Sequence, residues 1–195
     1  MIKVKRMSHA TFVTPDLDRQ IEYFTQITGL ALAERENGRA HLATKVGDLA
    51  VTLEKGDHAS CAKIAFQVAP GTPIEDIRRG IEAEGVRCET RNDPTPGVPQ
   101  MVTFQDPKGT VLEVFAEQTP IGKNQPVAGV GPLKLGHLAF CVSDPKAFAD
   151  FYGRVLGFRV SDWIQDWFVF MPISDGPAPS AARKGRCSVG ARPTR

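Results

Sequence analysis

The sequence has no hydrophobic run that would cross a membrane, which takes about 18 consecutive apolar residues. Its first residues, MIKVKRMSHATF, include basic side chains but no apolar stretch, so they do not resemble a secretory signal peptide. Cysteine is scarce as well, and the four cysteines show no CxxC spacing of the kind that zinc knuckles use. Scattered thiols are typical of reducing compartments, so we expect a cytoplasmic protein.

The sequence also lacks an excess of either charge. Its 24 basic and 22 acidic residues give a formal net charge of +2. Proteins that bind nucleic acid or anionic membranes usually carry a strong basic patch, so we expect neither partner. The hydrophobic content of 42% over 195 residues is that of a globular protein with one large or two small domains.

A long internal repeat is present. The stretch MSHATFVTPDLDRQIEYFTQITGL aligns without a gap with a second stretch that reads LGHLAFCVSDPKAFADFYGRVLGF. The constant offset is 128 residues, the separation of His9 from His137. In each copy an aspartate stands where a helix N-cap belongs and a glycine ends the helix.

The first copy opens a unit that we predict to be strand, helix and three strands. A weaker version of the same order follows it, with the proline-rich stretch Asn92–Pro99 as a long loop. The sequence thus predicts an α+β fold in which residues 1–118, the first module, hold two βαβββ units. Such units form curved, open barrel-like sheets with their helices on the convex side. The predicted elements are strand 4–13, helix Leu17–Ile27, strands Leu30–Arg35, Arg39–Ala43, Leu49–Glu54 and Ala62–Val68, a helix ending near Gly85, and strands Val86–Glu89, Met101–Gln105 and Val111–Phe115.

The chain after the first module divides into three parts. Residues 119–134 are rich in glycine and proline and are expected to be a linker. Residues 135–171 start a second module, with a helix after Asp144 and strands over Phe158–Ser161 and Trp167–Met171. Residues 172–195 do not match the first copy, and their Pro, Ala, Gly, Ser and Arg content predicts a disordered tail. We hypothesise a frameshift or an equivalent truncation near residue 171.

These motifs resemble the vicinal oxygen chelate superfamily of glyoxalases, bleomycin-resistance proteins and type I extradiol dioxygenases. The resemblance is carried by the nested repeat, by LGHLAFCVSDPKAFADFYGRVLGF and by DPKGTVLEVF near the end of the first module. Two tandem modules are most similar to the extradiol dioxygenases. The resemblance implies cleavage of catechol-type aromatic rings next to their hydroxyls, with Fe(II) and O₂.

The resemblance also implies a metal site in the second module. One histidine comes from its first strand, a second from its fifth strand and a glutamate from its eighth. Two histidines and a carboxylate leave open positions on iron for catecholate and O₂. His137 matches the first ligand, and the other two are missing from the sequence. We therefore expect Fe(II) in an intact parent protein, and neither bound iron nor activity in this shortened chain.

The first module has matching positions of its own, His9, Lys63 and Glu113. Lysine is a poor metal ligand at neutral pH because its lone pair carries a proton. One interpretation is that His9 forms a hydrogen bond inside the cavity while Glu113 pairs with Lys63, since a buried charge needs a partner. The other is that His9 and Glu113 bind a metal. His41 and His58, near turns, are expected to be solvated.

Three functions stay open at this point. The first is an extradiol dioxygenase homologue, inactive in this form. The second is a metal-free module that binds a small aromatic or drug-like molecule, as bleomycin-resistance relatives do. The third is a glyoxalase-like metal isomerase that uses His9 and Glu113. The incomplete second module leaves a sheet edge, so residues 135–171 are expected either to be loosely attached or to pair with a second copy, forming a homo-oligomer. Limited proteolysis is expected to leave a resistant fragment near residues 1–118.

Overall fold

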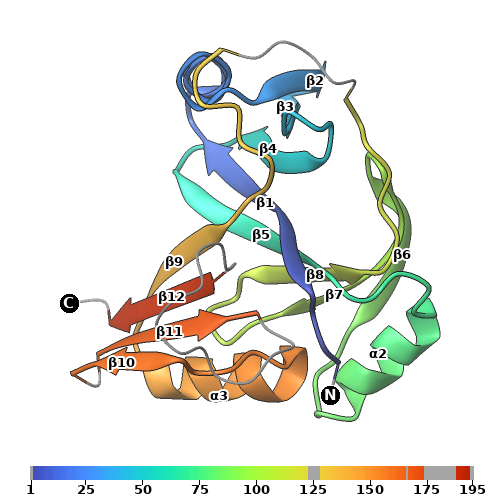
Figure 1. The fold of residues 1–195 in the computed structure, drawn as a ribbon, viewed down its shortest axis with the longest axis vertical. Helices are drawn as coiled ribbons and strands as arrows, with labels where there is room; N and C mark the ends of the chain where they lie inside the picture. The colour runs from blue at the N-terminus through green and yellow to red at the C-terminus, as the bar shows by residue number, and fades with distance from the viewer. Residues whose placement is uncertain (1, 123–127, 166, 174–187, 194–195) are drawn as a thin grey trace.

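The computed structural model describes residues 2–122, 128–165, 167–173 and 188–193. It contains an eight-stranded and a four-stranded sheet (Figure 1). The elements of the first module are β1 Arg6–Thr14, α1 Leu17–Glu22, the π-helical turn η1 Tyr23–Thr28, β2 Ala31–Glu36, β3 Arg39–Ala43, β4 Leu49–Lys55, β5 Ser60–Gln67, α2 Ile74–Glu82, β6 Glu89–Thr95, β7 Val98–Gln105 and β8 Val111–Phe115. Those that follow are β9 His137–Val142, α3 Pro145–Leu156, β10 Asp162–Ile164, β11 Phe168–Pro172 and β12 Ser188–Pro193.

The first module is one curled sheet made of two matching halves. Its strand order is β2-β3-β4-β1-β5-β8-β7-β6. Within each half the first strand pairs in parallel with the last, β1 with β4 and β5 with β8, and the halves meet where β1 and β5 pair antiparallel. This topology confirms the predicted α+β fold with two βαβββ units. The sheet curls as Figure 1 shows, with α2 outside it.

The helix boundaries follow the predicted caps. The Asp16 side chain accepts a hydrogen bond from the backbone N–H of Arg19, and Asp144 accepts from Lys146 and Ala147. Gly157 ends α3 in the left-handed conformation, with φ of 75°. The helix predicted over Leu17–Ile27 is present but changes character, since α1 continues as the wider π-helical turn η1.

Three predicted boundaries were wrong. The strand predicted over Val86–Glu89 shares only Glu89 with β6, which runs from Glu89 to Thr95. The stretch Asn92–Pro99 is not a long loop, because β6 runs to Thr95 and β7 starts at Val98, joined by a tight turn in which Gly97 has φ of 80°. β6 is the last strand of its sheet, and an edge strand tolerates proline because one side needs no hydrogen bonds. The strand predicted over Phe158–Ser161 lies slightly later, as β10.

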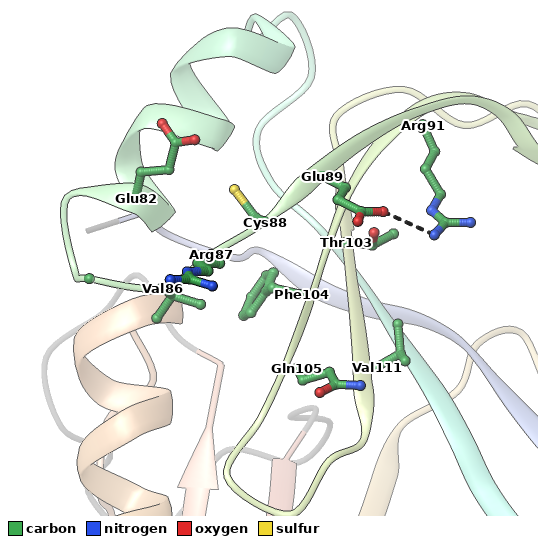
Figure 2. A pocket seen from close by; sticks show the side chains of 11 residues that line it. Glu82, Val86, Arg87, Cys88, Glu89, Arg91, Thr103, Phe104, Gln105 and Val111 are labelled. Carbon is green, nitrogen blue, oxygen red and sulfur yellow. Dashed lines mark hydrogen bonds and ion pairs between the residues drawn. The ribbon is translucent and has the colours of Figure 1, made fainter.

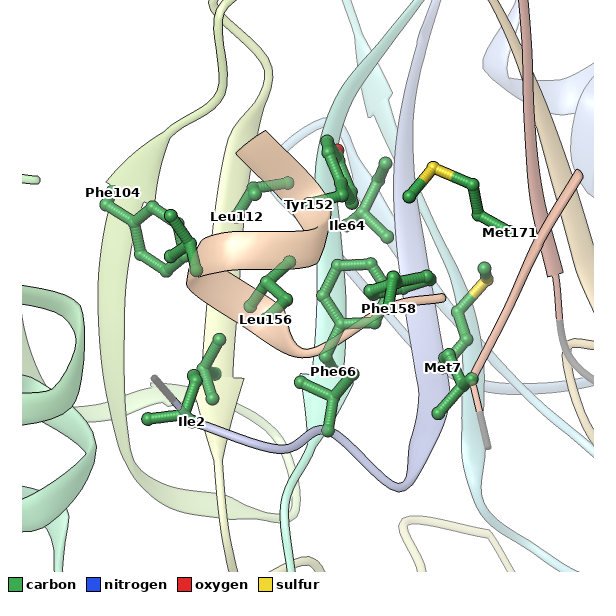
Figure 3. Packing of buried hydrophobic residues seen from close by; sticks show 14 of the residues in the cluster. Ile2, Met7, Ile64, Phe66, Phe104, Leu112, Tyr152, Leu156, Phe158 and Met171 are labelled. Carbon is green, nitrogen blue, oxygen red and sulfur yellow. The ribbon is translucent and has the colours of Figure 1, made fainter. Parts of the chain in front are cut away.

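The hydrophobic core joins the two modules. Residues of β5, β7 and β8 form one buried cluster with residues of β9, α3 and β11. Phe66 of β5 packs edge-to-face against Tyr152 and Phe158, with ring centroids 6.5 and 5.5 Å apart (Figure 3). The backbone N–H of Val4 also donates to the carbonyl of Leu156. Residues 135–173 are therefore packed against the first module, and the expectation of loose attachment was wrong.

The described parts of the linker also contact the first module. The backbone N–H groups of Ile121 and Gly122 donate to the carbonyl of Gly47. Further along, the N–H of Gly131 donates to the carbonyl of Thr28. Glycine and proline prevent regular structure in this segment, but its backbone is hydrogen-bonded at both described ends.

The predicted disordered tail was wrong for residues 188–193. These residues form β12, which pairs in parallel with β9 and antiparallel with β11. β4 has the same two relationships to β1 and β3 in the first module. The strand has no alternating pattern of its own, and its place is set by partners on both sides, a context effect that sequence patterns miss. Residues 174–187 and 194–195 lie outside the described residues. None of the described helices is long and apolar enough to span a bilayer.

Candidate functional site

The predicted metal ligand His137 lies at the start of β9. Side chains alternate along this strand, with Phe140 and Val142 buried in the core and His137, Ala139 and Cys141 exposed on the other face. The alternation confirms that the three exposed residues share one face of the four-stranded sheet. That face is the counterpart of the concave face of the first module, because β9 is the counterpart of β1.

An aromatic hollow of about 240 Å³ lies on this face. Ala139, Phe140 and Cys141 of β9 line it together with Trp167 and Phe168, which come from the turn before β11 and from its first residue. Trp163 packs instead against the hydrophobic core. Trp167 therefore lines the hollow of the second module, whereas Trp163 is a core residue.

The first module brings His9 and Glu113 together. His9 Nε2 lies 3.4 Å from Glu113 Oε2, and both side chains are buried. The ring of His9 stacks at 6.0 Å on Phe115. On its other side, Nδ1 lies 3.1 Å from the Ser8 hydroxyl, which donates its proton to Gln118 Oε1 at 2.8 Å. The hydroxyl has one proton, so Nδ1 is the donor to Ser8, a tautomer assigned from the network.

That assignment fixes what the His9–Glu113 contact can be. With Nδ1 carrying a proton, Nε2 has either a second proton or a lone pair facing the carboxylate. His9 Nε2 has no hydrogen-bond partner among the described residues, so its 3.4 Å contact with Glu113 is an ion pair only when this nitrogen carries a proton. The arrangement is a buried acid–base pair, with Ser8 and Gln118 holding the ring.

Lys63 does not join this pair, so the predicted pairing of Lys63 with Glu113 was wrong. Its Nζ lies 3.7 Å from Glu54 Oε1, and Arg39 contacts the same carboxylate at 2.8 Å. His41 is also buried, with Nδ1 3.1 Å from the Thr52 hydroxyl, so the expectation that it is solvated was wrong. Burial lowers the pKa of His41, and Glu34 opposes this shift. His58 is exposed, as expected.

The described residues do not fit a divalent metal. They contain no group of three His, Cys, Asp or Glu side chains placed to hold one ion. In the first module His9 and Glu113 face each other, and the third position holds Lys63, which contacts Glu54. In the second module His137 stands without the second histidine or the glutamate. An iron site of the expected kind is not formed by these parts of the chain.

Two of the larger hollows, each lined by several charged side chains, were not anticipated from the sequence. One of about 980 Å³ lies between the end of α2 and strands β6 and β7, where Arg87, Cys88, Glu89 and Phe104 are among its lining residues (Figure 2). The other, of about 470 Å³, lies by the β2–β3 hairpin, with His41 in its lining. Charged side chains line both. The charged residues that line these hollows are not spaced periodically in the sequence, so no sequence pattern indicates that a hollow forms there.

The sequence matches the profile of a known protein family. A profile described as the Glyoxalase/Bleomycin resistance protein/Dioxygenase superfamily matches residues 6–114 and 134–185. The match continues past residue 171, where the repeat was expected to end.

Curated relatives are ring-cleaving dioxygenases. The biphenyl-2,3-diol 1,2-dioxygenase of Paraburkholderia xenovorans (strain LB400) is 24% identical over 173 residues, covering 84% of this chain and 58% of the relative. The iron-dependent extradiol dioxygenase of Rhodococcus jostii (strain RHA1) is 24% identical over 176 residues, covering 83% and 57%. A manganese-dependent 2,3-dihydroxybiphenyl 1,2-dioxygenase from Geobacillus genomosp. 3 is 20% identical over 179 residues, covering 84% and 56%. The chain thus spans less than three fifths of the length of these relatives.

Solved structures agree on the fold. The 2,3-dioxygenase LapB from Pseudomonas sp. KL28 superposes with a TM-score of 0.79 at 19% identity, covering 100% of this chain and 72% of that one. The Mn(II)-bound glyoxalase from Novosphingobium aromaticivorans gives a TM-score of 0.80 at 21% identity, covering 100% and 63%. With the profile match over most of its length, the chain belongs to the Glyoxalase/Bleomycin resistance protein/Dioxygenase superfamily, and its homologues are extradiol dioxygenases.

Proposed function

We propose that this chain is an extradiol ring-cleaving dioxygenase homologue that does not cleave rings in its 195-residue form. The relatives named above support the first half, since they act on biphenyl-2,3-diol or are called extradiol dioxygenases. An intact parent would cleave catechol-type aromatics with Fe(II) and O₂. In such a parent His137 would be one of the residues that hold the iron, which would supply open coordination positions for catecholate and O₂.

The observation that carries the second half is that His137 belongs to no group of three metal-binding side chains among the described residues. This histidine lies on an exposed strand face. A single imidazole does not hold Fe(II) in the geometry that this chemistry needs. What the described residues do provide is the first module, the first ligand of the second module and an aromatic hollow beside it.

The test is iron reconstitution followed by assay. The purified chain is loaded with Fe(II) under anaerobic conditions, its iron content is measured, and catechol and 2,3-dihydroxybiphenyl are added with O₂. We expect no yellow ring-cleavage product, and an iron content that His137→Ala does not change. A full-length relative serves as the positive control. Turnover that disappears in His137→Ala would refute the proposal.

A second candidate function is metal-free binding of a small molecule by the first module. The hollow of about 470 Å³ beside His41 favours it. Calorimetric titration of metal-free protein with catechol or phenol reads binding without depending on the tryptophans, which lie in the second module. Saturable binding weakened by His41→Ala would support this function. A glyoxalase-like isomerase has no such support, because His9 and Glu113 have no third metal-binding partner among the described residues.

A further inference from the structure

β9 ends its sheet on one side. In the order β10-β11-β12-β9 it pairs with β12, and no described strand lies on its other edge. Its sequence, HLAFCV, has no lysine, glutamate or proline, the residues with which natural edge strands block pairing. Because no described strand pairs with it and its own residues do not block pairing, this edge is a template for another strand.

The first module shows what covers the equivalent edge. β1 is the counterpart of β9, and its far edge pairs antiparallel with β5. His9 of β1 and Lys63 of β5 hold matching positions in their two halves, which makes Ala10 the counterpart of Ile64. Ala10 and Ile64 are also the residues that lie opposite each other in the pairing. The two halves are therefore related by a local twofold axis that passes between Ala10 and Ile64.

We propose that two copies of this chain join through β9, paired antiparallel about a true twofold axis. The offset of 128 residues carries Ala10 to Leu138, so Leu138 lies opposite Leu138 of the second copy. The joined sheet would run β10-β11-β12-β9 and then, in the second copy, β9-β12-β11-β10. That order repeats the eight-stranded sheet of the first module, β2-β3-β4-β1 followed by β5-β8-β7-β6. We choose a second copy as the partner of this edge because the unit from β9 to β12 is the counterpart of each of the two halves that pair in the first module.

The dimer brings His137 of both copies to one concave face. They take the positions that His9 and Lys63 hold in the first module. The carboxylate is still lacking, because β12 places Gly190 beside Ala139 where β8 places Glu113 beside Ala65. Two histidines without the carboxylate do not complete the iron site. The dimer is therefore independent of the proposed lack of ring cleavage, and each can fail without the other.

Disulfide trapping tests the register. Residues directly opposite in antiparallel strands have Cα atoms about 4.5–5.5 Å apart, inside the range of about 4.4–6.8 Å that a disulfide spans. Leu138→Cys is oxidised mildly in the full 195-residue chain and run on non-reducing gels. We expect a covalent dimer that forms faster than in Val130→Cys, a control position that is 86% exposed outside β9. Native Cys141 is present in both variants and accounts for background linkage.

Sedimentation equilibrium tests the association itself and covers the case in which Leu138→Cys fails to fold. The unmodified chain is expected to be dimeric at about 100 µM, the range in which weak specific pairs associate. Ala139→Lys, at an exposed position on β9, should weaken the dimer several-fold by placing like charges near the axis. Val160→Lys, exposed but outside β9, should not. A monomer at this concentration overturns the proposal. So does a dimer that ignores Ala139→Lys, which would point to the edges β2 or β6, or to residues 174–187.

Discussion

At the scale of single residues, Tyr152 is the side chain on which the joint between the modules depends most directly. It is fully buried in α3, and its hydroxyl donates to Asp106 Oδ2 at 3.0 Å. The other oxygen of Asp106 accepts from the backbone N–H groups of Lys108 and Thr110 at 2.9 and 2.8 Å. One carboxylate therefore holds both the β7–β8 turn and the helix of the next module. The helical spacing of α3 is compatible with a buried Tyr152, but it gives no information on a hydrogen-bond partner 46 positions away.

Replacing Tyr152 with phenylalanine should destabilise the protein. The change removes one hydroxyl and leaves a buried carboxylate oxygen without its donor, at a cost of about 1–3 kcal/mol in the free energy of unfolding. Urea unfolding followed by circular dichroism measures it. The matched control is Tyr23→Phe, since Tyr23 is the chain's other tyrosine and is 52% exposed. Equal effects of the two substitutions would show that the Tyr152–Asp106 contact contributes nothing.

The same residue predicts a loss of stability in alkaline solution. Burial raises the pKa of Tyr152 well above its usual value, and the charge of Asp106 raises it further. Burial also raises the pKa of the Cys61 thiol to about 11. Both groups hold protons more tightly when folded, so their contribution to stability is complete below the unfolded pKa values near pH 9 to 10 and is lost as pH rises from there through the higher folded pKa values. Tyr152→Phe should show a shallower decline in stability between about pH 9 and 11 than the unmodified chain.

The buried pair of His9 and Glu113 should be strongly coupled. Removing either partner leaves the other buried without its polar neighbour, at a cost of about 1–3 kcal/mol. We expect His9→Ala and Glu113→Ala to be destabilising singly, and the double substitution to cost much less than the sum. A double-mutant cycle by urea unfolding isolates this interaction. His58→Ala, at an exposed histidine, is the control, and additive effects of the two buried changes would show that His9 and Glu113 do not interact.

At the scale of elements, the sequence predicted most of what depends on local chemistry. The caps at Asp16 and Asp144 and the glycine at position 157 are local, because each involves atoms within one turn of helix. The errors lie where distant partners decide. β6 and β7 extend through a proline-rich stretch because they pair with each other, and β12 exists because β9 and β11 flank it. The residue pattern within one segment does not show which distant strand it pairs with.

Gly157 offers a prediction at this scale because it does two things. It ends α3 with φ of 75°, and a Cβ at this position would lie 2.9 Å from the carbonyl oxygen of Ile2. Gly157→Ala should therefore lower the free energy of unfolding by about 1–2 kcal/mol, because alanine is unfavourable in the left-handed conformation. Displacing the N-terminal segment should lower it further. Gly71→Ala is the matched control, with φ of 79° and open space around its Cβ position. Thermal unfolding that lowers the melting temperature equally in both would rule out the close approach.

At the scale of the whole molecule, the sequence predicted the repeat and the family fold but not how the modules meet. The periodicity of α3 marks an apolar face, and several of its residues do pack on the chain's own second sheet. It does not show that Tyr152 and Leu156 join the outer face of β5 and β8, in one cluster with Phe66 and Leu112 (Figure 3). Helical spacing identifies which residues are buried and leaves open which sheet buries them. Residue 118 thus marks the end of the first repeat in the sequence, whereas the hydrophobic core contains residues from both sides of it.

This shared core predicts that residues 1–118 are not a stable unit. Cutting there uncovers Phe66, Phe104 and Leu112, all buried in the intact chain. A contiguous apolar patch of this kind favours aggregation and binding of hydrophobic dyes. We expect fragment 1–118 to bind 8-anilinonaphthalene-1-sulfonate, to elute as an aggregate on gel filtration and to unfold at a lower temperature than the full chain. Fragment 1–173 keeps α3 and is the control, so it should retain most of the stability. If 1–118 were monomeric and melted within a few degrees of the full chain, α3 would not stabilise the first module. The cluster around Tyr152 would then contribute little to the stability of the full chain.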